Sequence, residues 1–376
     1  MNDIFQITII LVASLIATII SRRINIPAVI GQMLVGILLA PAVLGWIHGG
    51  HTIDVMSEIG VILLMFLAGL EADLSLLRKY LKPSLIVAIT GVFAPLIVFG
   101  LTAKFMGYNI STSSFYGIVF AATSVSITVE VLQEYGKLSS RAGNIILGAA
   151  VVDDILAVLV LSIFTSTKNA SSNLTTQILL QILFVIFLIF VYKIIPKLWK
   201  FVDKLPIPNK HTTVALLICL ILSLTANAAG MSAVIGAFFA GLAIGQTNVA
   251  HKIEEYSSAI AYTIFIPIFF VSIALSVKFD SLLSNPLMIF SFTILAILTK
   301  FLPAYFTGKT FGLPNEENLL IGSGMVSRGE MALIIAQIGL TSHVIAENVY
   351  SELVIVIMLS TLIAPFLIKF SLRKSA

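Results

Sequence analysis

The sequence has 376 residues, of which 59% are hydrophobic and only 11% are charged, and its formal net charge is +4. It contains no long polar stretch from which a soluble domain could be built. Apolar segments near the roughly 20 residues needed to cross hydrocarbon recur along the chain and indicate transmembrane helices rather than a β-barrel. We therefore expect an all-α polytopic protein in membrane lipid, and we attribute its positive charge to topology and not to nucleic-acid binding.

The charges that flank the first apolar segment argue against a cleaved signal peptide, and the cysteine content argues against disulfides and cysteine-based metal sites. Asp3 precedes this segment and Arg22 and Arg23 follow it, which reverses the charge order of a secretory signal peptide, so we expect a retained helix. The single cysteine, Cys219, lies in an apolar run. It allows no intramolecular disulfide and no cysteine-based metal site, and we expect no cofactor.

The apolar segments predict about thirteen transmembrane helices. They cover residues 3–21, 27–46, 53–71, 83–106, 113–134, 141–165, 176–197, 211–228, 231–248, 257–277, 286–308, 316–340 and 348–369.

The basic residues sort to one side of the membrane when alternate loops are assigned to alternate sides. Most of the 22 lie on the same side, whereas Lys104, Lys168 and Lys278 fall opposite, and Lys300 and Arg328 lie within spans. By the positive-inside rule, this distribution predicts a multi-pass protein of the cell membrane with its N-terminus outside and its C-terminus in the cytoplasm.

An odd number of helices allows two six-helix halves of opposite orientation, joined by a linker helix at 176–197. Such inverted repeats are common in transporters. The sequence symmetry between the halves is weak, so the repeat rests on topology and on two motifs in matching spans. The fifth span contains AATSVSITVEVL and the twelfth contains GSGMVSRGEMALI, and each is the fifth span of its half.

Both motifs contain small and polar residues that weaken a helix, among them the run 121–128. Broken helices in matching positions of two halves indicate a substrate site near the middle of the membrane. The alternative is that small residues merely allow close helix packing. Charged residues within the motifs, Glu130 in the first and Arg328 and Glu330 in the second, favour the site. Glu130 either pairs with Arg328 or is solvated at the cytoplasmic end of its helix.

Two adjacent aspartates, Asp153 and Asp154, lie in the apolar run GNIILGAAVVDDILAVLVLSIF of the sixth span. A charged side chain at the bilayer centre costs about 2.5–3.5 kcal/mol, so such a pair requires a cavity, a counter-charge or a proton. Neighbours on a helix point about 100° apart and cannot both face one group. Lys300 in the eleventh span is the expected partner of one carboxylate, which leaves the other to bind a cation.

Burial favours the protonated form of a carboxylate, so a proton and a hard cation would compete for the same oxygens. Such competition is already an exchange mechanism. The alternative is that Asp153, Asp154 and Lys300 form a buried structural salt bridge, but one lysine cannot neutralise two carboxylates.

Seven motifs, in order along the whole chain, resemble the monovalent cation:proton antiporter-2 family, and most closely its NapA-type sodium/proton antiporters. They are LLMFLAGLEAD (63–73), ATSVSITVEVL, the aspartate pair, GAFFAGLAIG (236–245), IPIFFVSIAL (266–275), the buried Lys300 and SRGEMALI (327–334).

The resemblance implies an NhaA/NapA-like antiporter fold with two crossing broken helices, in a homodimer that works as an elevator. Residues 1–71 and 211–248 would form the dimerisation domain, with 176–197 as the linker helix. Residues 83–165 and 257–369 would form the ion-transporting core of this single transporter unit, 1–376.

The resemblance also implies roles for individual residues. Asp154 would bind the cation or the proton, and Asp153 would form a salt bridge with Lys300. Thr123 and Ser124 would supply further oxygen ligands to sodium. The aspartate pair resembles that of electrogenic members, which exchange two protons for one sodium ion. Sodium extrusion and pH homeostasis would be the natural tasks.

Three other functions remain as alternatives to sodium/proton exchange. Potassium/proton exchange is the first, because one sequence does not distinguish monovalent cations, lithium included. The sequence ends at Ala376, so we expect no attached nucleotide-binding regulatory domain of the kind found in related potassium-efflux proteins. A cation channel is disfavoured because there is one carboxylate–lysine site and no filter ring. Adjacent aspartates on one helix do not form the dyad of an aspartyl protease, so we expect no enzyme activity.

Overall fold

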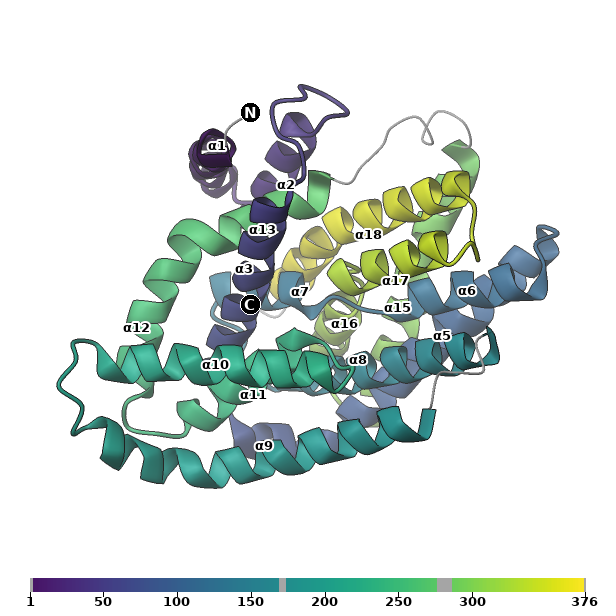
Figure 1. Cartoon of the computed structure of the whole chain (residues 1–376). Helices are drawn as coiled ribbons and strands as arrows, with labels where there is room; N and C mark the ends of the chain where they lie inside the picture. The colour runs from purple at the N-terminus through teal and green to yellow at the C-terminus, as the bar shows by residue number, and fades with distance from the viewer. Residues whose placement is uncertain (1–2, 169–173, 276–285, 375–376) are drawn as a thin grey trace. The chain divides into compact units, whose positions relative to one another are not determined.

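The protein is described from a computed structural model, and the description covers residues 3–168, 174–275 and 286–374. Regular structure in these residues is helical throughout (Figure 1). The helices in chain order are α1 (Asp3–Arg23), α2 (Ala28–Leu39), α3 (His51–Glu71), α4 (Leu74–Lys79), α5 (Leu81–Phe105), α6 (Ile110–Ala121), α7 (Val125–Glu134), α8 (Arg141–Lys168), α9 (Leu174–Val202), α10 (Lys210–Ala228), α11 (Ala233–Gly245), α12 (Ala250–Ile260), the π-helix η1 (Ala261–Phe265), α13 (Ile266–Leu275), α15 (Pro286–Thr310), α16 (Asn315–Gly324), α17 (Glu330–Thr341) and α18 (Glu347–Lys374).

Ten helical stretches among the described residues are long and apolar enough to cross a membrane, with α6 and α7, and likewise α12 to α13, each counted as one stretch. Three shorter apolar helices lie in α2, α11 and α17. The predicted fold class, an all-α polytopic membrane protein, is confirmed. The count of thirteen spans and the inverted repeat stay predictions.

The chain forms two compact units. Unit 1 comprises Met1–Asp54, Leu76–Ala157 and Phe270–Ala376, and unit 2 comprises Val55–Ser75 and Val158–Phe269. These units are defined by contacts within one chain. The division into dimerisation and core domains concerns assembly and motion, and it stays a prediction.

Unit 1 contains the long helix α5, which packs against α6 and α15, while α18 packs against α15, α16 and α17. The approach of α6 to α5 requires glycine at position 117, because a Cβ there would lie 2.3 Å from the carbonyl oxygen of Leu96. In unit 2, α9 and α11 both pack against α10. Close backbone approach through small residues is typical of packed membrane helices.

The second and tenth spans are among those that differ from their predicted bounds. The second span was predicted to reach residue 46, but α2 ends at Leu39. Ala40 adopts an extended conformation (φ −58°, ψ 157°) because Pro41 follows it and disfavours the helical region for the preceding residue. The tenth span, predicted at 257–277, begins at Ala250 and contains the π-helix η1, which apolar periodicity does not reveal.

Candidate functional site

Both predicted breaks are present in unit 1. Between α6 and α7, the backbone is extended at Ala122 (φ −66°, ψ 141°) and at Ser124 (φ −104°, ψ 115°). The second break runs from the end of α16 at Gly324 to the start of α17 at Glu330. The first break contains Thr123 and Ser124 and the second contains Ser327 and Gly329. Serine, threonine and especially glycine have lower helix propensity than alanine.

The two breaks lie against each other and satisfy each other's backbone groups. The amide of Ser124 donates to the carbonyl oxygen of Ser327 over 3.0 Å, and the Ser327 hydroxyl donates to the carbonyl oxygen of Ser124 over 2.5 Å. Thr128 Oγ1 donates to the carbonyl of Gly324 over 2.7 Å. A Cβ at Gly329 would lie 2.6 Å from Ser124 Oγ, so this crossing needs glycine. Irregular backbone at membrane depth is thus buried in protein, as it must be.

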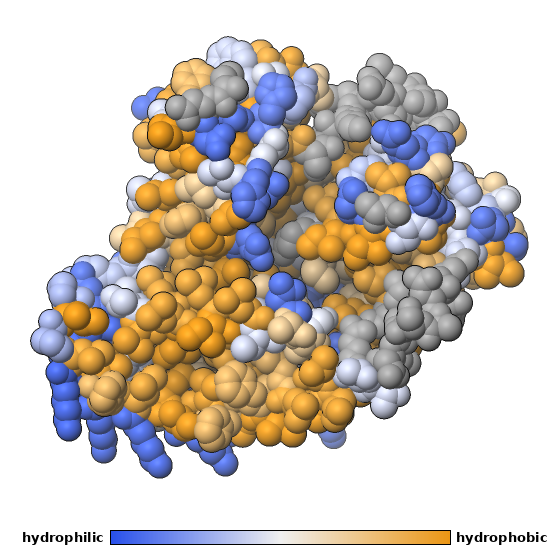
Figure 2. Space-filling model, viewed as in Figure 1, coloured by the Kyte–Doolittle hydropathy of each residue, from blue (hydrophilic) through white to orange (hydrophobic). Residues whose placement is uncertain are grey.

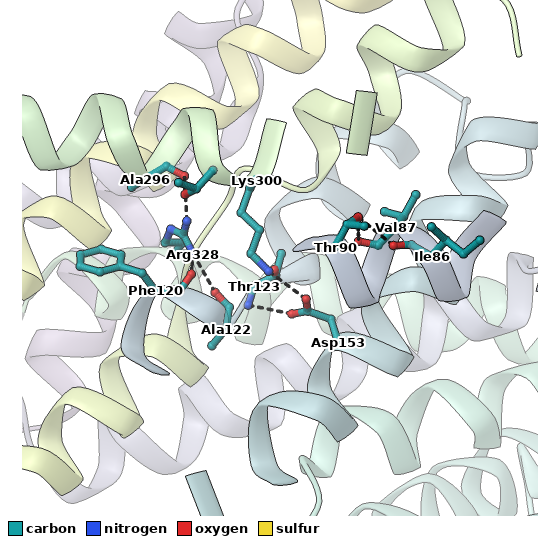
Figure 3. Close-up of polar contacts among 11 residues, drawn as sticks. Ile86, Val87, Thr90, Phe120, Ala122, Thr123, Asp153, Ala296, Lys300 and Arg328 are labelled. Atoms are coloured by element: carbon teal, nitrogen blue, oxygen red, sulfur yellow. Dashed lines mark hydrogen bonds and ion pairs between the residues drawn. The ribbon is translucent and has the colours of Figure 1, made fainter. Parts of the chain in front are cut away.

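Arg328, in the second break, is fully buried and binds backbone carbonyls (Figure 3). Its Nη1 donates to Phe120 and, over 3.2 Å, to Ala122, while Nη2 donates to Ala296 over 2.7 Å. The guanidinium also lies 5.3 Å from the centroid of the Phe120 ring. The guanidinium cation therefore sits at the C-terminal end of α6, where it compensates the partial negative charge of the carbonyls at the helix end.

The structure describes the side chain of only one of the two glutamates in the motifs. Glu130 lies in α7 and is only 8% exposed, so the interpretation that it is solvated is wrong. Glu330 begins α17, and its side chain lies outside the described part of the structure. The hydrogen bonds of Arg328 that fix the crossing go to main-chain oxygens, for which sequence carries no signal.

Asp153 of α8 contacts both α15 and the first break, all within unit 1. Lys300 Nζ of α15 donates to Asp153 Oδ1 over 2.8 Å, and the amide of Thr123 in the first break donates to Oδ2 over 3.1 Å. Both charged side chains are fully buried (Figure 3). A Cβ at Gly91 would lie 3.7 Å from Lys300 Nζ, so the backbone of α5 borders the pair. Sequence reasoning missed Gly91, a glycine in an apolar span without other distinguishing features.

Asp154 follows on the same helix and is partly exposed, unlike Asp153. The structure thus pairs Lys300 with Asp153 and leaves the Asp154 carboxylate in the more accessible position. The two carboxylates can have different surroundings because neighbouring residues on a helix point about 100° apart.

The first break contains the two hydroxyl residues that were predicted to bind sodium, Thr123 and Ser124. Thr123 Oγ1 is buried and has no hydrogen-bond partner among the described residues. Ser124 Oγ lies 2.9 Å from Ser126 Oγ. Carboxylate and hydroxyl oxygens are the ligands that a hard alkali cation requires. Within the described ranges, no group of three or more His, Cys, Asp or Glu residues is arranged to hold a metal ion.

Comparisons with known proteins bear on the family and on the fold. The family described as "Sodium/hydrogen exchanger, transmembrane" matches residues 10–374. A Na⁺/H⁺ antiporter of Enterococcus hirae is 47% identical over 371 residues, 97% of each chain. The Na⁺/H⁺-K⁺ antiporter GerN of Bacillus cereus is 39% identical, over 98% of this chain and 95% of GerN. The solved structure of the sodium/proton antiporter MjNhaP1 from Methanocaldococcus jannaschii matches with a TM-score of 0.68 at 16% identity, over 98% of this chain and 97% of MjNhaP1. This last likeness confirms the antiporter-like fold.

Proposed function

The chain belongs to the sodium/hydrogen exchanger family, and from this premise we propose that it is a secondary active antiporter that exchanges sodium for protons. One observation, the difference in burial between two adjacent aspartates, assigns the proposed exchange to specific residues. Of two adjacent carboxylates in α8, Asp153 is buried with both oxygens engaged, whereas Asp154 is partly exposed. We therefore assign the transported cation and proton to the Asp154 carboxylate.

Exchange follows from competition at Asp154. A carboxylate removed from bulk water holds either a proton or a cation, and the protein needs no more than alternating access to convert that competition into coupled transport. Sodium bound at Asp154 would be ligated further by the hydroxyl of Thr123, whose buried oxygen has no hydrogen-bond partner among the described residues. Ser124 lies next to it in the same break.

Lys300 supplies the second proton in this proposal. When sodium binds, its charge opposes that of the ammonium, so Lys300 releases a proton while Asp154 releases another. Two protons then leave for one sodium ion, and one net charge crosses the membrane in each cycle. With the inside negative, proton entry and sodium exit would be driven by about 2.3 kcal/mol per 100 mV for that charge.

The remaining features of the proposal follow the family likeness. The transporter would be a homodimer in the cell membrane, with its N-terminus outside and its C-terminus in the cytoplasm. Its core would move as an elevator against a dimerisation domain. It would act without a cofactor and without enzyme activity, and its role would be sodium extrusion and pH homeostasis.

Potassium/proton exchange is the second candidate, and the observation that favours it is the relative GerN. That protein is named a Na⁺/H⁺-K⁺ antiporter, and it matches 98% of this chain at 39% identity. Oxygen ligands alone do not distinguish two alkali cations, because selection depends on the size and rigidity of the site.

The test is proton flux in proteoliposomes that carry an imposed proton gradient, with sodium, lithium or potassium added, and with or without a potential clamp. We expect sodium to dissipate the gradient, the clamp to change the rate, and Asp154→Asn to abolish the flux. Glu255→Gln, which removes an exposed carboxylate in unit 2, is the matched control and keeps full activity. A response to potassium alone establishes the second candidate, and cation flux without protons refutes antiport.

A further inference from the structure

The C-terminal part of α9, in unit 2, carries a row of lysines on one face. Lys193, Lys197 and Lys200 lie in the helix and Lys204 lies just past its end, and all four are exposed. Their spacing of four, three and four residues keeps them on one side of a helix with 3.6 residues per turn. We call these four residues the lysine row.

The opposite face of α9 is buried. Its buried residues include Leu188, Ile195 and Trp199, and the helix packs against α10 and α11. The lysine row therefore points away from unit 2. Figure 2 shows extended hydrophilic side chains projecting from the edge along which the C-terminal half of α9 runs in Figure 1, below a largely apolar surface.

The lysine row has no internal counter-charge. Within the described residues, none of its four ammonium groups has a carboxylate within 4.0 Å. The acidic residue between Lys200 and Lys204 is Asp203, and its Oδ1 lies 2.8 Å from Nε2 of His211. Several uncompensated charges so close together repel one another and favour an anionic partner.

The same face continues toward the start of α9 as an apolar surface. Ile182, Ile186 and Phe190 are 52%, 56% and 58% exposed, and their four-residue spacing places them in line with the lysine row. The face thus changes from apolar to basic within one turn, between Phe190 and Lys193. A soluble anion needs only the basic part, whereas a phospholipid presents acyl chains and a phosphate in this same order.

We propose that the lysine row binds the headgroups of anionic phospholipids, whose acyl chains lie against the apolar part of the same face. The ligand class is a phosphodiester headgroup attached to acyl chains, such as phosphatidylglycerol. The lysine row would then fix the depth of α9 in the membrane. This inference is independent of which ion the protein transports, because it uses no residue of the ion site.

The test uses the full-length protein in detergent, with native mass spectrometry to count bound lipids and a thermal-unfolding assay to measure stabilisation. The probes are phosphatidylglycerol, phosphatidylcholine and inorganic phosphate. We expect wild type to prefer phosphatidylglycerol over phosphatidylcholine, and the variant K193Q/K197Q/K200Q/K204Q to lose that preference by about tenfold or more, given the attraction of each basic residue to an anionic surface.

Two further variants keep the proposal falsifiable. R22Q/R23Q/K252Q/K309Q removes the same charge from four exposed positions elsewhere in the chain and should keep the preference. K193R/K197R/K200R/K204R retains the charge and should also keep it. The proposal is overturned if the glutamine variant of the lysine row prefers phosphatidylglycerol as strongly as wild type does, if the scattered variant loses as much, or if inorganic phosphate stabilises the protein as well as the lipid does.

Discussion

Two ion pairs join α8 to neighbouring helices of unit 1, and they differ mainly in depth. Asp153 pairs with Lys300 of α15 over 2.8 Å, and both side chains are fully buried. Arg141, at the start of α8, holds Glu317 of α16 by two hydrogen bonds of 2.6 and 2.7 Å, with the side chains 37% and 28% exposed.

The comparison shows that contact geometry alone does not set the importance of a charge pair. Water screens the Arg141–Glu317 pair, and if either partner is lost the other is hydrated, so we expect it to contribute about 0.2–1 kcal/mol. Neither Asp153 nor Lys300 has that alternative, so each requires the other. A buried pair that depends on both members is well suited to respond when a cation arrives beside it.

The largest expected effect is that of Lys300→Gln, which leaves Asp153 buried without its counter-charge. We expect unfolding in detergent to require about 3–5 kcal/mol less free energy, together with loss of coupled transport. The double variant Asp153→Asn/Lys300→Gln removes both charges and should regain much of the stability without regaining transport. Equal instability of the single and double variants would show that the pair matters through packing and not through charge.

The next effect separates the two adjacent aspartates. Asp154→Asn should abolish sodium-dependent proton flux yet change the free energy of unfolding by less than about 1 kcal/mol, because its carboxylate is partly exposed. Asp153→Asn should destabilise the protein more, since it leaves Lys300 without its carboxylate partner. Thermal unfolding and flux measured on the same preparations check this, and the reverse order of the two destabilisations would contradict it.

An intermediate effect is expected at the crossing of the two breaks, where the contacts are buried but neutral. Ser327→Ala removes the donor to the Ser124 carbonyl and the 3.1 Å contact with Thr128 Oγ1. The loss should be about 1–3 kcal/mol, the cost of leaving a buried polar group unsatisfied. Ser360→Ala is the control, because the Ser360 hydroxyl is buried and, among the described residues, bonds only within its own helix, to Ile357. A similar loss in both variants would argue against a special role for the crossing.

Sequence was sufficient for the parts of this molecule that carry a local signal. Apolar runs of membrane-spanning length located most helices, and runs of small and polar residues located both breaks. The residues also showed that one of two aspartates needed Lys300. The residues alone did not show which aspartate pairs with Lys300, because that depends on how α8 is rotated against α15. The family resemblance favoured Asp153.

Other contacts had no signal in the sequence. The carbonyl partners of Arg328 are main-chain atoms brought near by the crossing, and any residue type at those positions would offer the same oxygens. Arg141 and Glu317 lie at the ends of predicted spans, where charged residues are ordinarily solvated, so their pairing across 176 residues of sequence was not foreseen. These contacts follow from tertiary packing, which overrides local preference.

The smallest effect is expected at the exposed pair, and it tests the comparison from the other side. Arg141→Gln should lower the free energy of unfolding by about 0.2–1 kcal/mol, and high salt should reduce the difference because ions screen an exposed pair. A double-mutant cycle with Glu317→Gln isolates the pair's own contribution from other effects of each change. A coupling energy as large as that between Asp153 and Lys300, or one that salt leaves unchanged, would mean that depth of burial does not distinguish the two pairs. The assignment of the buried pair to the transport cycle would then lose its physical basis.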